Sequence, residues 1–175
     1  MQTEIIDTKK IRQAFISAAS DFILLLEKVP EDRLNTAPFE GSWTPGQVGD
    51  HVTKFLSGIA QVQKSPQVAP GRPVDRYEPA MRAIFLDFER KATAPPNVVP
   101  GSGPFDRQQQ VAVLKEISAV IETHITEAWL GKICAGIPFP TLAELTGLEW
   151  IYFGTYHLQR HTHQLETICL TDQVF

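Results

Sequence analysis

The chain has 175 residues, of which 43% are apolar and 21% charged, and its formal net charge is −4. This length suits a single domain, residues 1–175, with one hydrophobic core, and this composition excludes wholesale disorder. Nucleic acid is not expected as a partner, because neutralising phosphates needs clustered positive charge and no Lys/Arg stripe alternates with aromatic residues.

The sequence also argues against a membrane or a disulfide-rich protein. No apolar run approaches the roughly 20 residues that cross a bilayer, and the polar start MQTEIIDTKKIRQ is unlike a signal peptide. We therefore expect a cytoplasmic protein with no membrane partner. Cys134 and Cys169 lie far apart without a CxxC motif, which predicts reduced and partly buried thiols, with one reactive thiol as the alternative.

Two helices are predicted in the first third of the chain. Apolar residues recur at three- and four-residue steps from Asp7 to Lys28, the pattern of a helix with one buried stripe. Thr44 and Pro45 predict the next helix start, because a hydroxyl cap is followed by proline at the first helical position. The apolar face of this second helix comprises Val48, His51, Val52, Phe55 and Ile59.

Two further long helices follow proline-rich connections. A shorter helical stretch is predicted over residues 78–91, and the third main helix over residues 106–126. Thr141 and Glu144 have the spacing of a capping box, so the last helix is predicted to begin there and to run to about residue 170. Four long helices without an alternating strand pattern predict an all-α four-helix bundle with long connections, not necessarily wired up-down-up-down.

Three histidines form a candidate metal site. His157 and His161 are four residues apart on the last helix, so their rings project from one face and can share an ion. His51 lies in the apolar stripe of the second helix, and facing helices of a bundle come close enough to share a metal. The alternatives are a hydrogen-bonded histidine pair at 157 and 161 and a satisfied core histidine at 51. His163 points roughly 200° from His161, and His124 lies near a helix end, so both are excluded.

Other residues near this site suggest supporting roles. Gly154 lies one turn before His157 and either leaves room above a metal or allows close helix contact. Gln47 and Gln164 lie one turn from ligand histidines and could hydrogen-bond the rings or a bound water, with simple surface exposure as the alternative. No side chain is identified as the general base, since Asp50 points roughly 100° away from His51.

The sequence resembles the DinB/YfiT-like superfamily. The resemblance spans nearly the whole chain and rests on WTPGQVGDH in the second helix, IFLDFERKATAPPNVVP in the middle and PTLAELTGLEWIYFGTYHLQRHTHQL near the end. It implies a four-helix bundle, frequent homodimers, and a metal such as zinc or nickel on His51, His157 and His161. Some relatives are thiol S-transferases that use bacillithiol, mycothiol or glutathione.

These observations favour a metal-dependent enzyme of the transferase or hydrolase type. One divalent ion, zinc or nickel first and iron or manganese otherwise, would activate water or a low-molecular-weight thiol toward a small-molecule substrate. The first alternative is a non-catalytic metal-binding or stress-related helical bundle protein whose ion has a structural role. The second is a vestigial triad that binds no metal.

Overall fold

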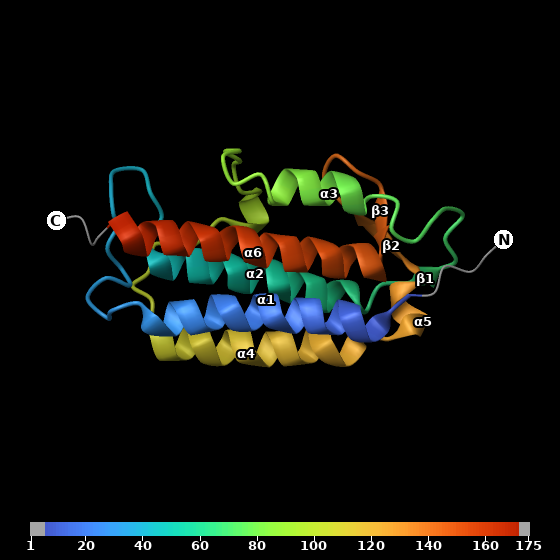
Figure 1. The fold of residues 1–175 in the computed structure, drawn as a ribbon, viewed down its shortest axis with the longest axis horizontal. Helices are drawn as coiled ribbons and strands as arrows, with labels where there is room; N and C mark the ends of the chain where they lie inside the picture. The colour runs from blue at the N-terminus through green and yellow to red at the C-terminus, as the bar shows by residue number, and fades with distance from the viewer. Residues whose placement is uncertain (1–5, 172–175) are drawn as a thin grey trace.

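The computed structural model describes residues 6–171 and places four long helices side by side along its longest axis (Figure 1). They are α1 (Thr8–Lys28), α2 (Pro45–Val62), α4 (Arg107–His124) and α6 (Gly147–Thr171). Helix α1 packs against α4 and α6, and α2 packs against the same two helices. The predicted helical bundle is confirmed in this coarse sense.

The apolar stripes that predict these helices form the core between them. The large, fully buried side chains include Phe15, Phe22, Leu26, Leu56, Ile59, Leu114 and Ile121. Helices α1, α2 and α4 begin where a side-chain oxygen accepts a backbone N–H that has no partner inside the helix, at Asp7, Thr44 and Asp106. At Thr44 the reciprocal bond from Gln47 completes a capping box.

In chain order, α1 runs one way along the bundle, α2 and α4 run the opposite way, and α6 runs as α1 does (Figure 1). Helices α2 and α4 therefore point in the same direction, and the chain between them must return along the bundle. This return passes through β1 (Gln67–Val68), helix α3 (Glu78–Phe85) and the short 3₁₀ helix η1 (Pro96–Val98). Helix α3 packs against α6 on the way.

A small sheet at one end of the bundle corrects the all-α prediction. Strands β2 (Ile133–Pro138) and β3 (Glu144–Thr146) form an antiparallel pair, and β1 adds to the other side of β2. A one-turn helix, α5 (Glu127–Leu130), precedes β2. The strands are short and β2 pairs with residues far away in sequence, so no local alternating pattern marks them.

The predicted start of the last helix is wrong by several residues. Glu144 lies in β3 and accepts the N–H of Gly136, and Thr141 has a positive φ of 69° in the turn between the strands. The capping box lies at Thr146 and Glu149 instead. The Glu149 N–H donates to Thr146 Oγ1 at 3.1 Å, and the Thr146 N–H donates to Glu149 Oε2 at 2.9 Å.

Helix α3 is also shorter than predicted, ending at Phe85 rather than near residue 91. Arg160 on α6 donates to the carbonyls of Asp87 and Arg90, so these groups are bound outside any helix. Within residues 6–171, no helix has both the length and the apolar character that crossing a bilayer requires.

Candidate metal centre

The rings of His51, His157 and His161 meet between α2 and α6. Each offers one nitrogen, and these three atoms lie within 4.8 Å of one another. The ring centroids are 4.6 Å apart for His51 and His161, 4.6 Å for His157 and His161, and 5.3 Å for His51 and His157. In the part of the chain that the structure describes, this is the one group of three His, Cys, Asp or Glu side chains close enough to share an ion.

Local sequence explains why the rings converge. His157 and His161 lie one turn apart on α6, so both project from the same face. His51 lies in the buried stripe of α2, beside Val52 and one turn before Phe55. Since α2 packs against α6, the two apolar faces bring the rings together.

The nitrogen spacing suits a tetrahedral ion. His51 Nε2 and His157 Nε2 are 3.4 Å apart. Two imidazoles on one tetrahedral zinc ion, with bonds of about 2.05 Å, would have their nitrogens about 3.3–3.4 Å apart. The structure therefore already holds these two rings at the separation that a shared ion requires.

Hydrogen bonds on the outer nitrogens orient two of the rings. His51 Nδ1 lies 2.7 Å from the carbonyl oxygen of Val98, which can only accept, so Nδ1 carries the proton and Nε2 keeps its lone pair. His161 Nδ1 lies 2.7 Å from Gln164 Oε1, which leaves His161 Nε2 as the lone-pair nitrogen. Both contacts are of the kind that orients metal-binding histidines.

Two buried imidazole nitrogens lack a hydrogen-bond partner among the described residues. They are His161 Nε2 and His157 Nδ1. A buried polar atom without a partner is costly, and an ion is one explanation for it. An ion on the three Nε2 atoms would give His161 Nε2 its partner, although it would not reach His157 Nδ1. The donor set and the partnerless His161 Nε2 together fit a divalent metal that prefers imidazole ligands.

Burial keeps all three imidazoles neutral. Loss of hydration, helped by the charge that His51 would carry when protonated and opposed by the hydrogen bond to Gln164, lowers the pKa of His161 to about 3. Burial also lowers the pKa of His157 well below its ordinary value, and it lowers the pKa of His51 despite the opposing hydrogen bond to Val98. Neutral imidazoles at pH 7 have the free lone pairs that metal binding needs.

Aromatic side chains surround the triad. The Phe55 ring stacks on His157 with centroids 4.3 Å apart and planes 9° apart. Phe85 of α3 and Phe153 of α6 also contact the His157 ring, and Trp43 contacts His51. These rings provide the apolar surroundings that lower the histidine pKa values.

The three residues predicted to support the site, Gln47, Gly154 and Gln164, differ in where their contacts lie. Gln164 contacts the ring of His161, with its Oε1 2.7 Å from Nδ1. Gln47 instead caps α2, where its Oε1 accepts the Thr44 N–H and its Nε2 donates to the Gly101 carbonyl. A Cβ on Gly154 would lie 2.9 Å from Ile59 Cδ1, so this glycine allows close helix contact and does not leave room over the rings.

The residues excluded from the triad lie away from it. His163 is exposed and stacks on Phe88, and His124 is exposed at the end of α4. Asp50 accepts the Gly101 N–H at 2.8 Å and pairs with Lys54. The Val98 carbonyl was missed by sequence reasoning, because a main-chain acceptor in a proline-rich loop has no signature in residue type.

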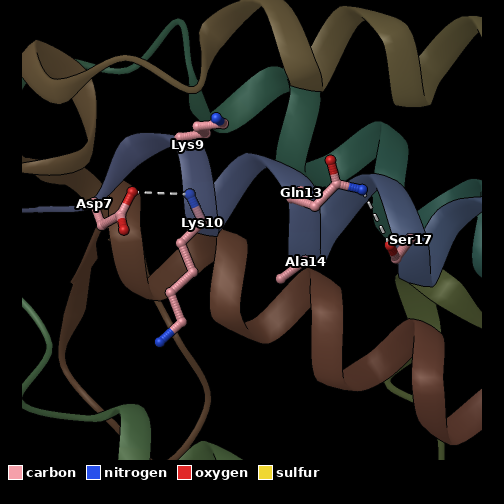
Figure 2. A pocket seen from close by; sticks show the side chains of 6 residues that line it. All are labelled: Asp7, Lys9, Lys10, Gln13, Ala14 and Ser17. Carbon is pink, nitrogen blue, oxygen red and sulfur yellow. Dashed lines mark hydrogen bonds between the residues drawn. The ribbon is translucent and has the colours of Figure 1, made fainter.

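A separate surface hollow runs along the first half of α1 (Figure 2). Its lining comprises Asp7, Lys9, Lys10, Gln13, Ala14 and Ser17. The interactions drawn there are the helix cap of Asp7 and a 3.4 Å contact between Gln13 and Ser17. None of the three histidines belongs to this hollow.

Comparisons with known proteins agree with this architecture. A relative from Bacillus subtilis (strain 168), the uncharacterized protein YuaE, is 26% identical over 147 residues, which cover 82% of this chain and 87% of the relative. The crystal structure of TT2238, a four-helix bundle protein, matches with a TM-score of 0.57 at 18% identity, over 91% of this chain and 98% of the other. At that identity the likeness establishes the fold alone. Residues 14–165 match the family model described as the DinB superfamily, and the chain therefore belongs to that superfamily.

Proposed function

We propose that the protein is a metal-dependent enzyme of the transferase or hydrolase type, with one divalent ion on His51, His157 and His161. The observation that carries this proposal is the convergence of three neutral imidazoles whose ligand atoms lie within 4.8 Å. Three ligands within residues 6–171 suit a catalytic site, since structural zinc sites are usually closed by four protein ligands.

The ion would supply Lewis acidity, which lowers the pKa of a water molecule or thiol that reaches it. The protein's own contribution is to hold three rings on two packed helices and to keep them unprotonated. The aromatic surroundings of Phe55, Phe85 and Phe153 limit water around His157. We propose a low-molecular-weight thiol as cosubstrate, because a thiolate is a good ligand for zinc.

Metal analysis of the purified protein tests the first step. We expect about one equivalent of zinc or nickel per chain, retained through gel filtration. His157→Ala should lose the ion, whereas His163→Ala replaces an exposed histidine outside the triad and should keep it. A triple-alanine variant at the three ligand positions that still holds stoichiometric metal would overturn the assignment.

A reaction screen tests the second step. The metal-loaded protein is mixed with bacillithiol, mycothiol or glutathione and an electrophile, and in parallel with ester and amide substrates. Conjugation or hydrolysis above the level of the His157→Ala variant would support the enzyme. Stoichiometric metal without any turnover would favour a non-catalytic metal-binding protein.

A further inference from the structure

The proline-rich return between α3 and α4 is bound to α2 where it passes the triad. We call residues 96–101 the strap. Its Val98 carbonyl accepts from His51 Nδ1 at 2.7 Å, and its Val99 carbonyl accepts from Lys54 Nζ at 2.8 Å. The N–H of Gly101 donates to Asp50 Oδ2 at 2.8 Å.

The α2 side chains that bind the strap lie on one face of the helix. Gln47, Asp50 and Lys54 are spaced three and four residues apart, so they follow one another along the helix surface. Gln47 Nε2 donates to the Gly101 carbonyl at 3.2 Å. Asp50 and Lys54 also pair with each other at 2.9 Å, so each side chain fixes the other while it binds the strap.

Apolar packing holds the strap chiefly at Val98, whose side chain packs against the core. The side chains of Pro96, Asn97 and Val99 are exposed, and those of Val98 and Pro100 are only half-buried. The Val98 carbonyl is therefore held by the packing of its own side chain and, on the C-terminal side, by the polar contacts from α2 to Val99 and Gly101. This carbonyl is the group that decides which His51 nitrogen carries the proton.

We propose that Asp50 and Lys54 are positioning residues for the metal centre. By fixing Val99 and Gly101 they hold the Val98 carbonyl against His51 Nδ1, so that the Nε2 lone pair faces His157 and His161. The Val98 carbonyl is the direct partner of His51, and losing a partner of that kind typically weakens metal binding 10- to 100-fold. Asp50 and Lys54 act through this carbonyl, so their effects should lie at or below the lower end of that range. This inference rests on the proposed function only in requiring that the triad binds metal, not that a reaction follows.

Zinc affinity, measured by competition with a chromophoric chelator, is the first test. We expect Asp50→Ala to weaken zinc binding about tenfold and Lys54→Ala severalfold. Asp50→Asn keeps an oxygen for the Gly101 N–H and should recover most of the affinity. Lys115→Ala is the matched control. It removes an ion pair between Lys115 on α4 and Glu27 on α1, away from the triad, and should change zinc affinity less than twofold. If Asp50→Ala binds zinc as tightly as Lys115→Ala does, the proposal is wrong.

The tautomer of His51 in the metal-free protein is the second test. Nitrogen NMR of histidine-labelled protein should show the proton on Nδ1 of His51 in the wild type and a mixture of tautomers in Asp50→Ala and Lys54→Ala. An unchanged tautomer in both variants would overturn the proposal, even if affinity fell. The tautomer tests the positioning role of Asp50 and Lys54 separately from the proposed metal site. A wild-type protein that binds no zinc would overturn the metal site, and the tautomer of His51 would still show whether Asp50 and Lys54 position its ring. If Asp50→Ala fails to fold, Lys54→Ala decides.

Discussion

Helix α6 carries two buried polar sites, Glu149 and the histidine pair that begins at His157, about 12 Å further along its axis. The first has a full set of hydrogen-bond partners, and the second does not. Glu149 is fully buried, and its carboxylate accepts from Arg72 through both oxygens and from the N–H groups of Tyr77 and Thr146. Two turns later, His157 and His161 are left with buried nitrogens that have no partner among the described residues. Breaking a closed network of this kind leaves buried groups without partners, whereas the open one already has such groups, for which a bound ion or water is one explanation.

Breaking the closed network should have the largest effect on stability. Glu149→Ala would leave the Arg72 charge and two backbone N–H groups without their acceptor, which costs about 3–5 kcal/mol. Thermal unfolding should therefore shift downward by roughly 10 °C. Glu166→Ala, at an exposed position of the same helix, should leave the midpoint in place. If the two variants unfold alike, the buried network is not an anchor of the fold.

Replacing a histidine of the triad should lower zinc affinity and leave the stability of the fold nearly unchanged. His157→Ala removes a ligand, so we expect zinc affinity to fall by more than the roughly 100-fold seen for indirect partners. The metal-free variant should unfold close to the wild type, because the core is built from apolar side chains on all four long helices. Titration with zinc and urea unfolding of the metal-free protein measure the two quantities. A variant that lost its fold together with its metal would contradict the contrast drawn here.

Acid should destabilise the metal-free protein through the triad. The pKa of His161 is lowered to about 3 in the folded state, whereas the unfolded chain binds a proton near pH 6.5. The unfolded state therefore gains more protons as the pH falls, and stability is lost from about pH 6.5 downward. Between pH 6.5 and 5 the loss from His161 alone should be about 1–2 kcal/mol. Urea unfolding across this range measures it, and the dependence should weaken in His161→Asn but persist in His163→Asn.

Removing the side chain that orients His161 should have a smaller effect on zinc binding than removing a histidine of the triad. Gln164→Ala removes the acceptor on His161 Nδ1 and should weaken zinc binding about tenfold. Gln159→Ala, an exposed glutamine on the same helix, is the control and should bind as the wild type does. Equal affinities for the two variants would mean that His161 needs no partner to hold its ring.

The helical part of the fold could be predicted because its signals are local. The stripe of α1 and the Thr44–Pro45 start of α2 are complete within a few turns of sequence, and both match the structure. The sheet could not be predicted in this way, since its strands are short and Cys134 of β2 pairs with Gln67, which lies before α3 and α4 in the sequence. The capping box of α6 shows the limit of motif reading, because two Thr-x-x-Glu sequences lie five residues apart and only tertiary pairing decides between them.

The site could be predicted as far as its side chains. His157 and His161 follow from helical periodicity, and the polar ring of His51 stands out in an apolar stripe. The Val98 carbonyl and the contacts of Asp50 and Lys54 depend on where a loop crosses the bundle. From the sequence, the role of Asp50 could be predicted only from its angle to His51 on the helix. That angle does not reveal that Asp50 binds the main chain of the loop at Gly101.

The shared direction of α2 and α4 separates the loop that contacts His51 from the packing of the helices in the core. A chain that must travel back along the bundle cannot be shortened to a tight turn, so the return is a permanent part of the fold. Its outward-facing positions, such as Pro95 to Asn97, pack little against the core. A substitution in this stretch can therefore shift the loop against His51, while the helices that carry the histidines keep their packing.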